Sequence, residues 1–180
     1  MNYRFISIAV LSMIGVVLMG YVVQTTSAES SGSETDRSTE IASPATTSLQ
    51  TVELYYYRPQ DDMDVKGDLQ CSSAGLAAVP YKVERSSAVI RDTVEILLTR
   101  ELQQAQQQNG VISEFPVSGL KLIGVRIENG LATVALDDTK DEITAGTCRA
   151  AVLQSQITAT VQQFPSVAEV RFVPETLFGM

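Results

Sequence analysis

The residues that most enzymes use for acid–base and nucleophilic chemistry are sparse in this 180-residue chain. It contains no histidine, which removes the commonest general base and every serine or cysteine triad that depends on imidazole. The 13 Lys and Arg stand against 21 Asp and Glu, for a formal net charge of -8, and such a charge repels phosphate backbones. We therefore expect no catalytic residues, no cofactor and no binding to nucleic acid.

The two cysteines, Cys71 and Cys148, are the residues best placed for covalent chemistry. Residues 5–23 are a candidate export signal, and an even pair of cysteines in an exported chain is the setting in which disulfides persist. A bond between them would close a loop of roughly 78 residues, which in the chain-entropy model stabilises the fold by about 4 kcal/mol. We expect this disulfide, with two free buried thiols as the alternative. A Cys-x-x-Cys redox motif is absent, and two sulfurs without histidine rarely hold a metal.

Two acidic runs resemble calcium ligands in residue type but not in spacing. Neither has the full ligand pattern with its glycine and terminal glutamate. We interpret both runs as solvated loops and expect no metal site. Their members are Asp61, Asp62 and Asp64 in the first run, and Asp137, Asp138, Asp141 and Glu142 in the second.

Three further residues are candidates for an interaction surface. Tyr55 and Tyr57 share one face of a predicted strand and could bind something flat or amphipathic, although ordinary sheet packing explains them equally well. Arg149 follows Cys148 at a predicted helix start, where the helix dipole disfavours a cation. We expect Arg149 to pair with a carboxylate of the acidic loop before it.

The N-terminal segment is the clearest targeting signal. Residues 5–23 carry no charge and would span about 28 Å as a helix, which matches a bilayer core. Arg4 precedes the segment and the next cation is Arg37, so we expect the N-terminus in the cytoplasm and the remainder outside. Residues 1–28 are a signal anchor or, if cleaved near Ala28, a signal peptide. Residues 29–50 are a disordered linker rich in Ser and Thr.

The first half of the folded region predicts a strand and a helix. Residues 52–57 are β-branched and aromatic, which favours a strand. Residues 61–78 are irregular, and a short edge strand over 81–83 is optional. From about residue 87 a helical period begins and runs to Asn109-Gly110, a typical helix end. The apolar stripe of this helix consists of Ile90, Val94, Leu97, Leu98, Leu102 and Ala105.

A hairpin over residues 120–136 is the strongest local pattern. Asn129-Gly130 between two alternating runs specifies a two-residue type I′ turn, and this turn fixes the register of the strands. One face of the hairpin is then apolar and packs on the core. The pairs predicted on that face are Ile127 with Ala132, Val125 with Val134, and Ile123 with Leu136.

A second helix over residues 147–163 ends before Pro165, and a last strand follows over 167–173. The helix is apolar at Ala150, Leu153, Ile157, Val161 and Phe164. The sequence thus predicts an α+β fold, a two-layer sandwich. Its antiparallel or mixed sheet has about four strands, and both amphipathic helices lie on one face. The domain covers residues 51–175, and 176–180 form a tail.

The chain resembles the GerMN domain family of sporulation and spore germination proteins, as a single-copy member. The matching residues are Leu54, Tyr55, Tyr56, Tyr57, Phe115, Pro116, Gly119, Leu122, Asn129, Gly130, Gly146, Thr147, Cys148, Arg149, Gln156, Ile157, Thr160, Phe164, Pro165, Val167 and Val170. The resemblance implies an extracytoplasmic domain similar to ring-building motifs, without known catalytic residues. Its partners would be envelope proteins or peptidoglycan, and a homo-oligomer is compatible with it. Where the family has Gly-Pro after the first helix, this chain has Thr99-Arg100-Glu101, so we expect that helix to run on.

These observations favour a non-enzymatic interaction module in the cell envelope, single-pass with its domain outside the membrane or secreted after cleavage. Two other hypotheses stay open. The chain could bind a cell-wall fragment or other small ligand, or it could be a wall-modifying enzyme.

Overall fold

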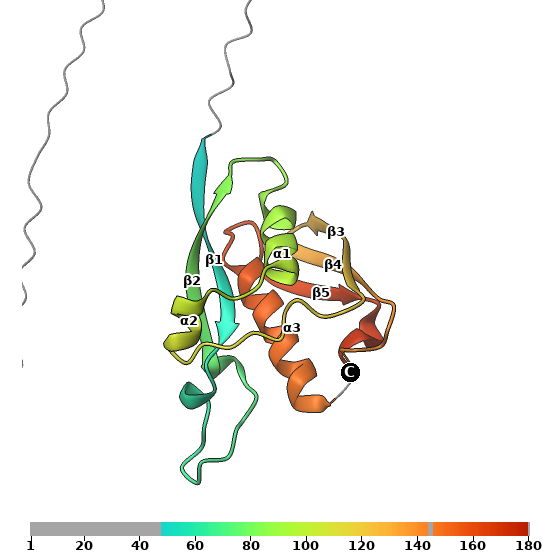
Figure 1. Ribbon diagram of the computed structural model, residues 1–180. Coiled ribbons are helices and arrows are strands. Elements are labelled where there is room, and N and C mark those ends of the chain that lie inside the picture. Colours follow the sequence, from blue (N-terminus) through green and yellow to red (C-terminus); the bar gives the residue numbers. More distant parts are fainter. Residues whose placement is uncertain (1–47, 144–145, 180) are drawn as a thin grey trace, which may run out of the picture. The chain divides into compact units, whose positions relative to one another are not determined.

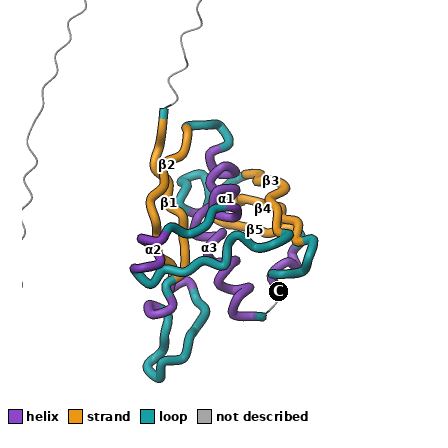
Figure 2. Tube along the Cα trace, viewed as in Figure 1, coloured by secondary structure: helices purple, strands orange, loops and turns teal. Residues whose placement is uncertain are grey.

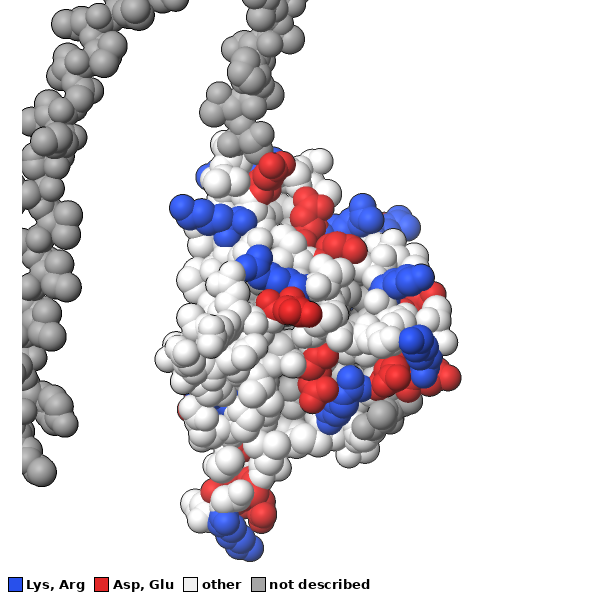
Figure 3. Space-filling view, in the orientation of Figure 1, with Lys and Arg blue, Asp and Glu red and all other residues white. Residues whose placement is uncertain are grey.

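The computed structural model describes residues 48–143 and 146–179 (Figures 1 and 2). The predicted membrane segment and most of the predicted linker lie outside these residues. Within them, every helix is too short or too polar to cross a membrane. Lys and Arg side chains alternate with Asp and Glu over the face seen in Figure 3, so that face carries no block of one sign.

The elements follow one another in the predicted order. They are β1 (Leu49–Tyr57), β2 (Leu76–Glu84), α1 (Val89–Thr99), α2 (Gln104–Gln108), β3 (Leu120–Glu128), β4 (Leu131–Asp138), α3 (Thr147–Gln162) and β5 (Glu169–Val173), with 3-10 turns at Pro59–Asp61, Ser73–Gly75 and Glu175–Phe178. The α+β class is confirmed. The prediction of one four-stranded sheet is wrong, because the described strands form two sheets, β1-β2 and β3-β4-β5 (Figure 1).

Both sheets share one hydrophobic core with the two long helices. Helices α1 and α3 pack on each other, and each contacts strands of both sheets. Four of the five residues predicted as the apolar stripe of this helix are buried, with Leu153, Ile157 and Val161 fully enclosed, whereas Phe164 is half-buried just after α3. The core also reaches past the predicted end of the domain, since Leu177 and Phe178 are buried and Phe178 meets Phe172 edge to face at 4.8 Å.

The β3-β4 hairpin has the predicted turn but not the whole predicted register. Asn129 and Gly130 both have positive φ, at 50° and 84°, as a type I′ turn requires. Ile127 faces Ala132 and Val125 faces Val134, as predicted. A bulge between Leu122 and Gly124 then shifts the pairing. Leu122 faces Leu136 instead of Ile123, and the Ile123 side chain is 62% exposed.

The first predicted helix is broken in two. Helix α1 ends at Thr99, where Arg100 turns to an extended conformation, and α2 begins only at Gln104. The guanidinium of Arg100 lies over the Tyr81 ring, 4.3 Å from its centroid, a cation–π contact that favours the bend. Leu102 still packs on the core, but Ala105 is exposed. The glutamine-rich segment after Leu102 offers little apolar surface to hold a longer helix.

Strand β2 is far longer than the predicted edge piece over 81–83, despite Pro80 at its centre. Pro80 lies opposite Glu53 in the ladder. The backbone N–H and C=O of Glu53 point away from β2, since both bond to the Gln163 side chain. At the position of Pro80, a backbone N–H would point away from β1. The proline therefore removes no hydrogen bond from the β1-β2 ladder.

Side chains of α3 and of Gln163, which directly follows it, close the second edge of β1 and explain the separation of the sheets. The Gln163 amide accepts from Glu53 N at 2.7 Å and donates to Glu53 O at 2.6 Å. Thr160 Oγ1 accepts from Tyr55 N at 3.1 Å, and Gln156 Nε2 donates to Tyr55 O at 3.3 Å. These polar groups take the place of a neighbouring strand, so β1 cannot pair with the second sheet.

Replacing Gln163→Ala is expected to lower the free energy of unfolding by about 2 kcal/mol, because two backbone groups of Glu53 lose their partner. Urea unfolding measures the loss, and faster hydrogen exchange at the Glu53 amide localises it. Gln162→Ala is the matched control, since its exposed amide bonds to Ala168 O outside the strand; a change below about 0.5 kcal/mol is expected there. Equal losses in both variants would contradict the role given to Gln163.

Candidate interaction site

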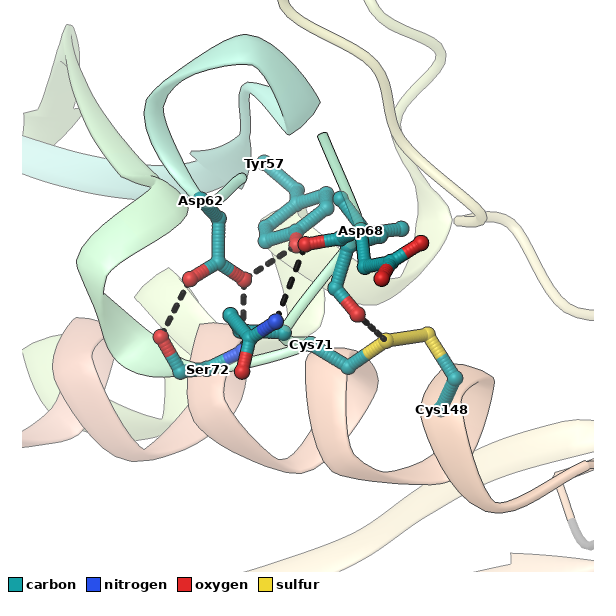
Figure 4. Close-up of a disulfide and its surroundings, with 8 residues drawn as sticks. Tyr57, Asp62, Asp68, Cys71, Ser72 and Cys148 are labelled. Carbon is teal, nitrogen blue, oxygen red and sulfur yellow. Dashed lines mark hydrogen bonds between the residues drawn. A yellow bond between two sulfur atoms is a disulfide. The ribbon is translucent and has the colours of Figure 1, made fainter. Parts of the chain in front are cut away.

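The end of β1 carries a buried hydrogen-bonded cluster of Tyr57, Asp62 and Ser72 (Figure 4). The Tyr57 hydroxyl donates to Asp62 Oδ2. Asp62 also accepts from the Ser72 amide at 2.6 Å and from the Ser72 hydroxyl. Both Tyr57 and Asp62 are buried. The cluster therefore fixes the start and the end of the loop over residues 58–75 to the sheet.

The protonation states of this cluster follow from its contacts. Burial would raise the pKa of Asp62, but the hydrogen bonds from Ser72 and Tyr57 outweigh it and hold that pKa below its usual value. Burial raises the pKa of Tyr57, and the hydrogen bond to Asp62 and its negative charge raise it further. Near neutral pH the carboxylate is charged and the phenol is neutral, an arrangement suited to holding structure rather than to exchanging protons.

A pH dependence follows for the stability of the fold. Because the Asp62 pKa is lowered on folding, its contribution is complete above the ordinary value of 3.8 and is lost as pH falls through the lower folded value. We expect the free energy of unfolding to fall less steeply below about pH 4 in Asp62→Asn than in the wild type. Urea titrations between pH 2 and 7, with Asp61→Asn as control, measure this slope; identical slopes in both variants would remove Asp62 as the cause.

Gly75 is the residue that lets Tyr57 lie in this position. A Cβ at Gly75 would lie 2.4 Å from Tyr57 Cε2 and 2.9 Å from Asp62 Cβ. Gly75→Ala is expected to cost about 3 kcal/mol of unfolding free energy, because a buried ring must move. Gly124→Ala, where no atom lies within 4 Å, is the control and should be neutral or slightly stabilising. Thermal unfolding of the two variants side by side provides the measurement, and similar melting temperatures would refute the steric argument.

The structure joins Cys71 and Cys148 in a disulfide, with their Cα atoms 5.2 Å apart (Figure 4). Cys71 lies in the irregular stretch before β2, and Cys148 lies in the first turn of α3. The bond therefore ties a long loop to a helix that is otherwise remote in sequence. No other cysteine exists in the chain.

Arg149 forms a second link between distant segments beside the disulfide. Its Nε donates to Glu114 Oε2 at 2.8 Å, and its Nη1 donates to the backbone carbonyl of Glu142. The expected carboxylate partner from the acidic loop is thus replaced by Glu114, from the segment before β3, while the acidic loop contributes a carbonyl. Nothing in the local sequence around Glu114 indicated this pairing, because 35 residues separate the two.

A cavity of about 320 Å³ lies beside these links. It brings Tyr57 and Arg149 together, whereas Tyr55 lies elsewhere and gives its amide to Thr160. The Gln156 side chain is buried at the cavity, and its Oε1 has no hydrogen-bond partner within the described structure. The wall is mostly apolar, and its residues are Tyr57, Ile112, Glu114, Gly146, Cys148, Arg149, Val152 and Gln156.

One carboxylate of each acidic run accepts hydrogen bonds from the backbone of its own loop, while Asp61 pairs with Arg58 and Asp62 belongs to the Tyr57 cluster. Asp64 Oδ1 accepts from the amides of Lys66 and Asp68. Asp138 Oδ2 accepts from the Ile143 amide at 2.8 Å. Among residues 48–143 and 146–179, no three Asp, Glu, Cys or His side chains gather in a way that could hold a metal ion.

Comparison with protein families identifies the domain. A family model described as "Germane: Sporulation and spore germination" matches residues 53–175. The chain belongs to the Germane family. The resemblance expected from the sequence is thereby confirmed, and the matched range contains every residue of the Tyr57 cluster and of the disulfide. No curated protein matches the chain significantly.

Solved structures similar to this Germane domain include the first GerMN domain of the sporulation protein GerM from Bacillus subtilis, with 17% identity over 68% of this chain and 80% of that chain, and a TM-score of 0.47. The tandem GerMN domains of the same protein are 15% identical over 77% of this chain and 44% of that chain, with a TM-score of 0.42. A putative lipoprotein from Clostridium perfringens is 17% identical over 69% of this chain and 73% of that chain, with a TM-score of 0.34.

Proposed function

We propose that this Germane domain is a non-enzymatic interaction module of the bacterial cell envelope, displayed outside the cytoplasmic membrane. The observation that carries the proposal is the disulfide between Cys71 and Cys148, because such bonds persist in oxidising compartments and are rare in the cytosol. The apolar run over residues 5–23 supplies a means of export. The partners of the domain are envelope proteins or peptidoglycan.

The side chains support binding better than catalysis. The chain has no histidine. The Asp62 carboxylate and the Tyr57 hydroxyl are hydrogen-bonded to each other in a buried cluster. The surface around the disulfide is held by covalent and charged links rather than by flexible segments. A fixed surface without histidine favours recognition.

Thiol labelling in intact cells tests the location. A membrane-impermeant maleimide should label Cys71 and Cys148 only after treatment with an impermeant reductant, while a cytosolic thiol protein stays unlabelled in both conditions. Labelling that needs a permeant reagent and no reductant would place the domain in the cytosol and refute the proposal.

Binding of a small ligand is the second candidate, favoured by the cavity beside Cys148 and the unpartnered Gln156 Oε1. Cavities of 300–1,000 Å³ are the usual size of small-molecule sites. Soluble muropeptides should then raise the melting temperature of the wild type and fail to do so in Arg149→Ala. Equal shifts in both proteins, or none in the wild type, would remove this candidate.

A further inference from the structure

The loop between Tyr57 and β2 exposes an unusual set of apolar side chains. Val65 is 104% exposed, Met63 is 53% exposed and Leu69 is 42% exposed. All three lie within seven residues, in the part of the loop that projects from the body of the domain at the lower end of Figures 1 and 3. We call residues 61–71 the projecting loop. Single exposed apolar residues are ordinary, but a cluster on one projection indicates a contact surface.

The projecting loop is ordered by its own hydrogen bonds. Asp64 Oδ1 accepts from Lys66 N at 2.8 Å and from Asp68 N at 2.9 Å. The backbone closes the same turn, since Asp64 N donates to Asp68 O and Gly67 N donates to Asp64 O. Gly67 has φ of 86°, a conformation that glycine adopts without strain. The tip therefore has a defined shape although no core residue covers it.

The base of the projecting loop is fixed as firmly. Asp62 is held by Tyr57 and Ser72, and its carbonyl accepts from Gln70 N at 2.9 Å. Cys71 is bonded to Cys148 on α3. A surface held in its binding shape loses little conformational entropy on association, which increases affinity for a given contact area.

The charges around the tip of the projecting loop limit the kinds of surface that it can bind. Of the four aspartates in residues 58–70, Asp62 is buried and Asp61 pairs with Arg58, so the tip itself carries Asp64 and Asp68 against Lys66. The whole chain carries -8. An anionic lipid surface repels such a segment. A protein depression with an apolar floor and a rim of Lys or Arg complements both the aliphatic tip and the carboxylates beside it.

We propose that the projecting loop is a docking element that inserts Val65, flanked by Met63 and Leu69, into an apolar depression with a basic rim on another envelope protein. This inference rests on the proposed function, because it names the surface through which the module acts. Val65 is the central contact, and the disulfide and the Asp62 cluster keep it in position.

Photo-crosslinking in intact cells tests the proposal with the full-length chain. A photo-reactive phenylalanine at position 65 should give one main adduct with a different protein, and mass spectrometry should place the crosslink in an apolar segment flanked by Lys or Arg. The same probe at position 123, which is exposed on β3, should give an adduct yield lower by about tenfold, the effect of burying one aliphatic side chain.

A second measurement uses substitutions at positions where folding is unaffected. With the probe at position 63, Val65→Asp should reduce the adduct about tenfold, whereas Ile123→Asp should leave it unchanged, and both proteins should melt as the wild type does. Adducts of position 65 with lipid, with a second copy of the chain, or with no molecule would overturn the docking role. Adducts at position 123 but not at 65 would also overturn it and leave the interaction-module function standing.

Discussion

Removing the disulfide with Cys71→Ser and Cys148→Ser together is expected to lower the free energy of unfolding by roughly 4 kcal/mol. The bond joins residues 77 positions apart, and in the chain-entropy model a loop of that length restricts the unfolded chain by about this amount. In the folded state the projecting loop also loses its tie to α3. We therefore expect faster cleavage within residues 61–71 by thermolysin, in addition to the global loss.

Urea unfolding of the double variant and of the wild type, with and without reductant, measures the effect. The reduced wild type should match the double variant to within about 1 kcal/mol, since both lack the same constraint. An unfolding free energy that reductant leaves unchanged would show that the bond contributes no stability.

Asp62→Ala is expected to cost about 3 kcal/mol, because it leaves the Tyr57 hydroxyl and the Ser72 amide buried without their charged acceptor. The neighbouring carboxylate supplies a matched control. Asp61 is exposed and forms an ion pair with Arg58 one helical turn away, so Asp61→Ala should cost less than about 0.5 kcal/mol.

Chemical denaturation of both variants at pH 7 decides between a structural and a surface role for Asp62.

The pKa of Tyr57 is a second readout, because Tyr57 is hydrogen-bonded to Asp62. With Asp62 absent, the Tyr57 pKa should fall, because the hydrogen bond and the negative charge that raise it are gone. Tyr57 absorbance at alkaline pH, read against an Asp62→Ala, Tyr57→Phe double variant, follows this change. Equal losses of stability in Asp61→Ala and Asp62→Ala would contradict the cluster.

Patterns that depend on neighbouring residues were sufficient to predict most elements of the fold. The Asn129-Gly130 turn, the stripe of α3 and the alternation of β5 are local signals, and the structure has each element at the predicted place. The bulge at Ile123 broke the predicted register because an extra residue leaves no distinct mark in an alternating run. Most of β2 was missed because a proline is tolerated in a strand only where its N–H position points away from the paired strand, and the β1-β2 register that sets this direction is not visible in the sequence.

Some residues of the site could be predicted from the sequence, but the contacts between them could not. The cysteines and Tyr57 could be named from residue type, whereas Asp62 was interpreted as one of several solvated aspartates. Its burial depends on Tyr57 and Ser72 closing over it from both ends of a loop. Glu114 was missed for a similar reason, since its ion pair with Arg149 joins segments that only tertiary packing brings together.

The glutamine and threonine side chains that close β1 have a consequence for self-association. An open strand edge is a template for adding strands from other molecules, which leads to aggregation. Here α3 occupies the free edge of β1, Pro80 removes a donor from the outer edge of β2, and a bulge interrupts β3. Three of the four outer edges of the two described sheets are thus guarded, and the fourth is the short strand β5 (Glu169–Val173). Growth of an intermolecular sheet at those three edges is therefore disfavoured, even when many copies are crowded together.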